Sequence, residues 1–307
     1  MNILHMKYAV EVAEAGSINK ASETLLIAQP NLSRSIKELE GDLGIVIFDR
    51  SAKGMILTPE GEEFIGYAKK ILGQIDEVEN IYKGGYAKRK FSVCVPRASY
   101  ISDAFSGFAQ KIGDGDAEIY YKETNSLKSI KKVLSSECKM GIIRYAENYD
   151  RYFKTLLEGK DLVCEKIAEF TYRIVTNRES PLAKLEEIHF SELEKYIEIA
   201  HADPYVPTLP LSLVKKEEIP DNIRRRIFVY ERASQFDLLS ENKEVFMWVS
   251  PMPEKLLKRY GLVQRKSAEN KRIYKDVLIY RKGYKLTELD RLFIEEVRRS
   301  KREHLDD

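Results

Sequence analysis

The first 43 residues read as three short amphipathic helices separated by two breaks. In the first helix the apolar residues recur at helical spacing, at Met6, Ala9, Val10 and Ala13. Gly16 can adopt the left-handed conformation that ends a helix, and Ser17 can cap the next one. Ala21 and Leu25 share one face of that second helix. The pattern therefore predicts a compact helix pair that ends before Ile27.

A third helix is predicted to begin at Gln29 and Pro30. Proline suits the first turn because its missing N–H would have no intrahelical partner there. The apolar residues form a single stripe, at Leu32, Ile36, Leu39 and Leu43. The opposite arc is polar and positively charged, at Gln29, Asn31, Ser33, Arg34 and Lys37. This arc is either an ordinary solvated face or a surface that binds a partner.

Residues 45–57 contain two apolar, strand-like runs on either side of Ser51-Ala52-Lys53-Gly54, which predicts a hairpin. Arg50 and Lys53 place positive charge at its tip. Compact helices, a helix with a polar outer face and a basic hairpin together describe a winged helix-turn-helix. Such a unit inserts its third helix into the major groove of DNA and sets the wing on phosphates.

A long helix should follow, with Thr58 as its N-cap and Pro59 at its first position. Its apolar residues are Phe64, Ala68, Ile71, Ile75, Val78 and Tyr82. They alternate spacings of four and three, a period of about 3.5 residues that is typical of a coiled-coil seam. The spacing predicts a homodimer formed through this helix; the alternative is a helix that docks on its own domain.

After Lys83-Gly84-Gly85-Tyr86, strand-like segments alternate with helical ones, as expected for α/β sheets with parallel pairing. A second α/β unit begins near EFTYRIVTN, and RIYKDVLIY with a final helix returns to the first sheet. We therefore expect a winged unit over 1–58, a linking helix over 59–85 and a two-lobed α/β region over 86–307. Lobe one should span about 91–163 and 268–307, and lobe two about 164–267.

Composition narrows the possible functions. The chain has 307 residues and a formal net charge of +2, which excludes a histone-like protein that binds polyanions by bulk charge. Residues 1–90 hold 12 Lys and Arg against 13 Asp and Glu, so any basic surface there must be local. The sequence has neither an apolar run long enough to cross a membrane nor a signal peptide, which predicts a cytoplasmic protein.

Cysteine and histidine spacing favours no metal site. Cys94, Cys138 and Cys164 are odd in number, far apart and without a C-x-x-C pattern, so neither a disulfide nor structural zinc is expected. We interpret them as small core residues, with a redox-sensing thiol as the alternative. No HExxH, G-x-S-x-G or Gly-rich phosphate loop is present, so the sequence predicts no catalytic residues and no enzyme.

Residues 21–50, ASETLLIAQPNLSRSIKELEGDLGIVIFDR, with LTPEG at 57–61, resemble the DNA-binding domain of LysR-type transcriptional regulators. The resemblance implies that Gln29, Pro30, Ser33 and Arg34 meet an operator, with Arg50 and Lys53 on wing phosphates. Asn31 and Lys37 lie on the same polar arc and complete the predicted DNA contacts. Two positions depart from the family. Ala28 stands where Ser or Thr is usual, which removes a helix cap, and Ala9 replaces a usual aromatic residue.

The C-terminal half of that family resembles periplasmic binding proteins, with a small effector in the cleft between two α/β lobes. Mapped onto this chain, the resemblance places Ser99, Asn125, Arg144 and His201 at strand ends that face the cleft. Ser99 at a helix N-terminus would suit an anion such as a carboxylate. Each has a structural alternative: an N-cap for Ser99, a surface ion pair for Arg144 and a turn for His201.

The resemblance implies a DNA-binding regulator whose small organic, anionic effector alters how a dimer, assembled into a tetramer, holds its operator. No cofactor and no membrane partner are expected. A solute-binding or enzymatic α/β protein with a vestigial helix-turn-helix is the alternative. The sequence leaves open the effector, the operator, the regulated genes, the sign of the regulation and the redox activity of the cysteines.

Overall fold

The computed structural model describes residues 2–51, 54–82, 89–202 and 223–305, without the side chains of 50, 51, 77 and 80–82. The chain divides into two compact units, Met1–Ala87 and Lys88–Asp307, each described here by itself. None of the helices in these ranges is both long and apolar enough to cross a membrane.

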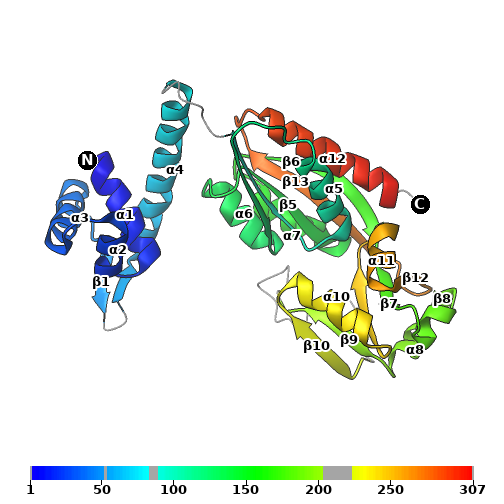
Figure 1. Cartoon of the computed structure of the whole chain (residues 1–307). Helices are drawn as coiled ribbons and strands as arrows, with labels where there is room; N and C mark the ends of the chain where they lie inside the picture. Colours follow the sequence, from blue (N-terminus) through cyan, green and yellow to red (C-terminus); the bar gives the residue numbers. More distant parts are fainter. Residues whose placement is uncertain (1, 52–53, 83–88, 203–222, 306–307) are drawn as a thin grey trace. The chain divides into compact units, whose positions relative to one another are not determined.

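The first unit is a helical domain with a short hairpin (Figure 1). Its elements are α1 (Ile3–Ala15), α2 (Ile18–Leu25), α3 (Gln29–Leu43), β1 (Phe48–Ser51), β2 (Gly54–Leu57) and α4 (Pro59–Tyr82). Gly16 and Gly44 end α1 and α3 in the left-handed conformation, and the Ser17 side chain caps α2. The three predicted helices and the predicted hairpin are therefore present.

The core of the first unit is made by the apolar stripe of α3 and the inner faces of α1 and α2. Ala9, Leu32 and Leu39 are fully buried in it, together with Ile47 at the entry to the hairpin. Ala9 is fully buried in this cluster, so the small residue that replaces the usual aromatic one is still a core residue.

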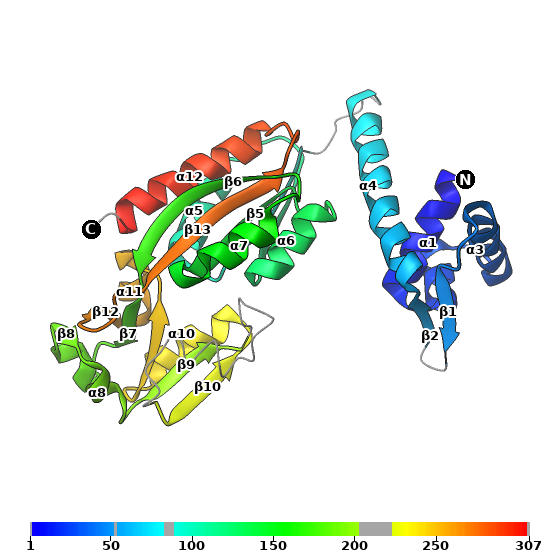
Figure 2. The same cartoon turned by 180° about the vertical axis from the view of Figure 1, so that it is seen from behind.

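The second unit contains two sheets (Figures 1 and 2). The first sheet has the strand order β4-β3-β5-β13-β6, with bounds β3 (Arg89–Val95), β4 (Ala117–Glu123), β5 (Met140–Ala146), β6 (Leu162–Thr171) and β13 (Ile273–Arg281). Its helices are α5 (Ser99–Ala109), α6 (Ser126–Leu134), α7 (Asp150–Leu157) and α12 (Glu288–His304). A 3-10 turn, η1 (Glu147–Tyr149), precedes α7. The helix α12 packs beside α5, and α6 packs on β5.

The second sheet has the order β10-β9-β11-β7-β12-β8. Its strands are β7 (Arg173–Asn177), β8 (Glu187–Ile188), β9 (Ile197–His201), β10 (Arg225–Val229), β11 (Val245–Val249) and β12 (Leu262–Ser267). Its helices are α8 (Phe190–Leu193), α10 (Arg232–Glu241) and α11 (Glu254–Tyr260), with a 3-10 turn η2 (Pro181–Lys184). The two sheets are the two expected lobes.

Two details of the predicted α/β region need correction. Both sheets are mixed. In the first, β3 pairs in parallel with β4 and β5, but β13 runs antiparallel to β5 and β6. In the second, β9 pairs in parallel with β10 and β11, but β11 runs antiparallel to β7. The predicted start of lobe two near residue 164 is wrong, because β6 pairs with β13 along its whole length and so belongs to the first sheet. The chain first enters lobe two at β7, which begins at Arg173.

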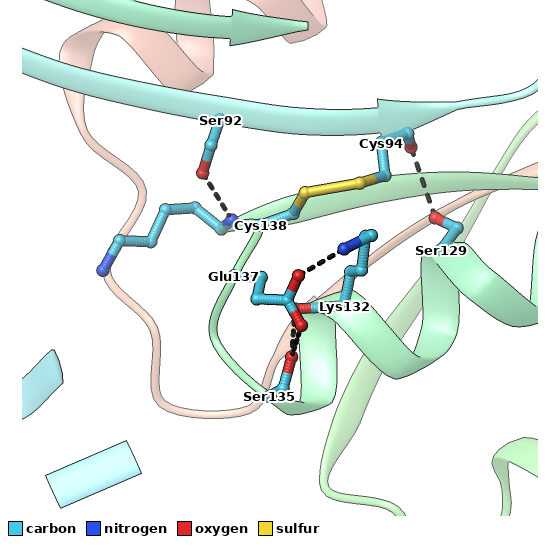
Figure 3. The surroundings of a disulfide bond; sticks show 8 residues. Ser92, Cys94, Ser129, Lys132, Ser135, Glu137 and Cys138 are labelled. Carbon is cyan, nitrogen blue, oxygen red and sulfur yellow. Dashed lines mark hydrogen bonds and ion pairs between the residues drawn. A yellow bond between two sulfur atoms is a disulfide. The ribbon is translucent and has the colours of Figure 1, made fainter. Parts of the chain in front are cut away.

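The expectation that no disulfide forms is also wrong. Cys94 on β3 and Cys138, just before β5, are joined by a disulfide (Figure 3). The two cysteines are 44 residues apart in sequence, but β3 and β5 are neighbours in the sheet, which brings them together. Both are buried, as expected of core residues, whereas Cys164 is free and exposed.

Candidate DNA-binding face and ligand pocket

The helix α3 separates its residues as the sequence pattern predicts. Its apolar stripe is buried at Leu32, Ile36 and Leu39. The opposite arc is open to solvent at Gln29, Pro30, Asn31, Arg34 and Lys37, with Ser33 half-buried at its edge. The Ala28 N-cap makes no side-chain hydrogen bond, so Pro30 is the sequence feature that favours the start of the helix. The predicted contact residues of α3 thus share one accessible face.

The backbone of the hairpin is hydrogen-bonded to α3 and to the end of α1. The Glu40 carboxylate on α3 accepts from the backbone N–H groups of Ile47, at 2.7 Å, and Phe48, at 3.2 Å. The Met55 N–H donates to the Gly16 carbonyl at 3.0 Å, where α1 ends. The wing therefore has a set position relative to α3. Glu40 was not among the predicted functional residues, although it is a charged residue beside the apolar stripe.

The side chains of the two basic residues predicted for the wing lie outside the part of the chain that the structure describes. Arg50 lies on β1, opposite Met55 on β2, but its side chain is outside the described residues. Lys53 also lies outside the described residues.

The predicted dimerisation residues of α4 divide into two groups. Ala68 is fully buried and Phe64 packs on the core of the first unit, while Lys69 pairs with Glu14 of α1 at 2.7 Å. The N-terminal half of α4 therefore docks on its own domain. Farther along, the exposed fractions reach 37% at Ile71 and 54% at Val78. Ile75 is half-buried, and the Tyr82 side chain lies outside the described residues.

In the second unit, a small pocket lies between the two lobes. It is lined by Arg97, Ser99, Arg144, Tyr172, His201, Arg232, Gln235, Met247, Trp248, Val249 and Ser250. Three of the four predicted effector contacts, Ser99, Arg144 and His201, are thus brought together. Asn125 is not among the lining residues; its side chain instead caps α6, accepting from the Lys128 N–H at 2.9 Å.

Arg144 reaches the pocket as part of a buried ion pair. Its Nε and Nη2 donate to the two oxygens of Asp276, at 2.7 and 2.6 Å. The Tyr100 hydroxyl also donates to Asp276, at 2.5 Å. Burial alone would lower the pKa of Arg144, but the Asp276 charge raises it above the ordinary value. Burial, and then the Asp276 charge, raise the pKa of Tyr100. Arg144 is therefore a fixed cation and Tyr100 a neutral donor.

Two further arginines bridge the lobes at the pocket. Arg232 of α10 donates to the Ser99 hydroxyl at 3.1 Å and pairs with Glu123 of β4 at 3.3 Å. Arg97 donates to the backbone carbonyl of Tyr230 at 2.7 Å. Burial raises the pKa of Glu123, and the neighbouring arginines offset part of that rise. Three arginines and two carboxylates, Asp276 and Glu123, therefore meet at the pocket.

Two helix N-termini open on the same pocket. Ser99 and Arg232 are the first residues of α5 and α10, and neither helix has a side-chain N-cap. Helix N-termini carry partial positive charge and N–H groups that suit an anion. The pocket also contains two buried polar atoms without a hydrogen-bond partner, Gln235 Oε1 and Trp248 Nε1. The arrangement suits a small anion that carries a further hydrogen-bonding group.

Sequence reasoning missed several of these residues. Arg97, Arg232, Gln235 and Trp248 were not predicted, and neither was Asp276 behind the pocket. Asp276 gave a usable signal, since it is a charged residue inside the apolar run RIYKDVLIY. Arg97 and Arg232 follow strands at positions comparable with those of Ser99 and His201, but order along the chain does not reveal which strand ends meet.

Comparison with known proteins bears on both units. Residues 3–62 match the family model described as "Bacterial regulatory helix-turn-helix protein, lysR family". The HTH-type transcriptional regulator BenM of Acinetobacter baylyi is 42% identical over 83 residues, which are 27% of this chain and 27% of BenM. The chain therefore matches less than a third of the length of that relative.

The structural likeness extends over the whole chain. Full-length OxyR from Pseudomonas aeruginosa superimposes with a TM-score of 0.65 at 15% identity, over 100% of this chain and 98% of that one. Full-length LysG from Corynebacterium glutamicum, described with bound effector Arg, gives a TM-score of 0.56 at 14% identity, over 99% of both chains. These likenesses show a shared full-length fold, from the helix-turn-helix through the linking helix to both lobes.

Proposed function

Because the chain belongs to the LysR family of helix-turn-helix regulators, we propose that it is a transcriptional regulator that binds operator DNA through α3 and the wing. The family consists of transcriptional regulators and not of enzymes. A regulator of this kind acts beside the bacterial chromosome, in the cytoplasm.

The observation that carries this proposal is the division of α3 into a buried stripe and an accessible polar arc. We assign base contacts to Gln29, Pro30, Asn31, Ser33, Arg34 and Lys37, and phosphate contacts to Arg50 and Lys53. Hydrogen-bonding side chains and arginine read base edges, whereas lysine and arginine on a wing hold phosphates in register. The near-neutral charge of the first 90 residues favours specific over nonspecific binding.

Fluorescence anisotropy on DNA that flanks the protein's own gene tests this assignment. Replacing Arg34 with alanine should weaken specific binding by roughly tenfold or more, because each good base contact is worth about 1–3 kcal/mol. Lys154→Ala removes an exposed lysine from α7 and is the matched control. Equal affinities for wild type and Arg34→Ala would exclude the assigned face.

We also propose that the pocket between the lobes holds a small anionic effector. Ser99 and Arg144 would bind the anionic group together with Arg232, beside the two uncapped helix N-termini, and His201 lies on the opposite lobe. Asn125 caps α6 and is not assigned to the effector. The effector can change DNA binding by no more than its difference in affinity between the DNA-bound and free arrangements.

Screening small carboxylates by thermal shift tests the pocket. Arg232→Gln should abolish the stabilisation by any carboxylate that raises the melting temperature of the wild type, because it removes an arginine that bridges both lobes at the pocket. Arg259→Gln, an exposed arginine on α11, is the control. An unaltered shift in Arg232→Gln would place the ligand elsewhere.

We propose that the chain acts as a homodimer through the C-terminal half of α4, and that two dimers form a tetramer. The exposed Ile71 and Val78, with Ile75 between them, support this proposal. Tyr82 continues the same spacing at the end of the helix. Two copies would double the basic contacts of a unit that is not basic overall, as a two-fold operator requires.

A further inference from the structure

Cys94 and Cys138 occupy a position where a bond between them can form and break within one sheet (Figure 3). Their Cα atoms are 6.4 Å apart, inside the range that a disulfide spans without backbone movement. We propose that the two cysteines are a reversible oxidation site, a dithiol that a peroxide converts into a disulfide locking β3 to the start of β5.

The backbone on both sides of the pair is held in place independently of the bond. The Cys138 N–H donates to the Lys132 carbonyl at 3.1 Å, and the next residue, Lys139, donates to the Ser92 hydroxyl at 2.9 Å. The Ser129 hydroxyl donates to the Cys94 carbonyl at 3.3 Å. Because these contacts do not depend on the sulfur atoms, the two thiols remain neighbours after reduction.

The bond adds a constraint that the sheet lacks. The strands β3 and β5 share two register pairs, Val93 with Met140 and Cys94 with Gly141. Immediately beyond Cys94 the chain supplies Arg97 and Ser99, and β5 supplies Arg144. The disulfide therefore links the two strands that carry the lobe-one side of the pocket, and its redox state controls how rigidly those strands are joined.

In the cytoplasm, where we expect this protein to act, the disulfide should form only under oxidising conditions. A regulator at the chromosome, as the proposed function has it, works where glutathione and thioredoxin keep thiols reduced. Disulfides in such a compartment are usually transient and redox-sensing. This step rests on the proposed function, whereas the geometry of the pair does not.

The chemistry balances with a peroxide as oxidant. The Cys138 thiolate, on the slightly exposed side of the pair, attacks one peroxide oxygen; the O–O bond breaks and leaves a sulfenic acid and hydroxide. The Cys94 thiolate then attacks that sulfur, the S–S bond forms and hydroxide leaves. In sum, two thiols and hydrogen peroxide give one disulfide and two waters. Two glutathione thiols reverse the step and become glutathione disulfide.

Counting free thiols in the full-length protein tests the site. After reduction and denaturation, alkylation and mass spectrometry should find three modified cysteines, Cys94, Cys138 and Cys164. After hydrogen peroxide treatment under native conditions only Cys164 should be modified, and the linked peptides of Cys94 and Cys138 should be recovered. Three modified cysteines after peroxide would overturn the proposal.

Variants distinguish the pair from its exposed neighbour. In Cys164→Ser the pair should still close, because Cys164 lies on β6 and takes no part. In Cys138→Ser, peroxide should produce no intramolecular link; Cys94→Ala is a second variant in case the serine disturbs the fold. A link between Cys164 and either partner would contradict the assigned pair.

Reversibility separates an oxidation site from a permanent structural bond. The oxidised protein is equilibrated with an excess of reduced glutathione and the linked peptides are measured again. Recovery of three free thiols supports the proposal, and retention of the disulfide overturns it. DNA enters neither measurement, so failure of operator binding would leave these results intact.

The locking effect is measured by hydrogen exchange. Backbone amides of residues 89–99 and 138–146 should exchange several-fold more slowly in the oxidised protein than in the reduced one, since opening of β3 from β5 is restricted. Peptides of α10, which does not follow either strand, provide the internal control. Equal exchange in both redox states would contradict the lock.

Discussion

Arg144 is a buried cation whose charge is compensated from behind the pocket. Asp276 is completely inaccessible to solvent and binds Arg144 through both oxygens, while Tyr100 supplies a third hydrogen bond. The guanidinium is thereby fixed in orientation before any ligand arrives. Preorganisation of this kind reduces the conformational entropy lost on binding.

Breaking this pair should be costly. Asp276→Asn leaves Arg144 as an uncompensated buried charge, and we expect the free energy of unfolding to fall by about 3–5 kcal/mol. The double variant Arg144→Met with Asp276→Leu should recover most of that loss, because it removes both charges. Urea denaturation at pH 7 measures the difference. A single variant within about 0.5 kcal/mol of wild type would contradict this account of the pair.

Asp103 on α5 contacts basic side chains of both α11 and α12. It pairs with Lys255 of α11, with Arg299 at 3.3 Å and with His304 at 3.5 Å, and it accepts from the Ser300 hydroxyl at 3.2 Å. Burial alone would raise the pKa of Asp103. The Lys255 hydrogen bond and charge, then His304 and Ser300, outweigh the effect of burial, so the pKa of Asp103 lies below the ordinary aspartate value of 3.8.

The lowered pKa of Asp103 determines how its contribution to the free energy of unfolding changes with pH. A carboxyl group with a lowered pKa in the folded state stabilises the fold above its unfolded pKa and loses that contribution as pH falls through the folded value. We expect Asp103→Asn to lower the free energy of unfolding by about 1–2 kcal/mol at pH 7. The deficit should shrink as the pH drops below 3.8, the ordinary pKa of an aspartate. Urea titrations across that range measure it; a deficit independent of pH would refute the charge argument.

Residues whose role depends on local spacing could be identified from sequence. Pro30 lies in the first turn of α3 as predicted. Ser99 and Arg144, which were placed by the family resemblance, reach the pocket. Arg232 and Asp276 could not be assigned, because their partners lie 109 and 132 residues away. Sequence order does not determine which strand ends meet.

At the scale of elements, α4 combines two roles that a single heptad pattern conceals. Its first turns pack on α1 through Ala68 and the ion pair of Lys69 with Glu14. Its later turns expose Ile71 and Val78. The N-terminal part of the seam predicted for dimerisation therefore packs on its own domain, and the C-terminal part is exposed. Helical periodicity identifies an apolar face, but it does not identify the surface that covers each turn.

The exposed half of α4 can be tested alone. Replacing both Ile71 and Val78 with aspartate should convert a dimer into monomers, because two charges would enter an apolar seam. Asp76→Lys changes the charge at an exposed position on the opposite face of α4 and should leave the dimer intact. Analytical ultracentrifugation measures the mass. A native dimer that persists in the double variant would exclude this interface.

The strands show a different limit of sequence reasoning. Apolar runs located β3, β5 and β13 correctly, but β6 was assigned to the wrong lobe because its exposed residues Cys164 and Glu165 interrupt the apolar pattern. The disulfide was missed for a related reason. Cys94 and Cys138 meet through the pairing of β3 with β5, which spacing along the chain does not encode.

At the scale of the whole molecule, the second unit couples its two lobes through charged contacts. Arg232 with Glu123 and Lys255 with Asp103 both join a residue of lobe two to one of lobe one. Arg97 of lobe one reaches the Tyr230 carbonyl of lobe two. A ligand that replaces any of these partners changes the relative stability of the lobe arrangements. In the proposed function, that free energy is what an effector uses to alter operator binding.

The most direct test of the account is a footprint of the full-length protein on the DNA flanking its own gene, at about 50 mM salt to favour phosphate contacts. We predict protection of a two-fold symmetric site that is lost in Arg34→Ala and kept in Lys154→Ala, with equal thermal stability in all three proteins. Absence of protection by the folded wild-type protein, with and without a carboxylate that stabilises it, would contradict the assignment as an operator-binding regulator.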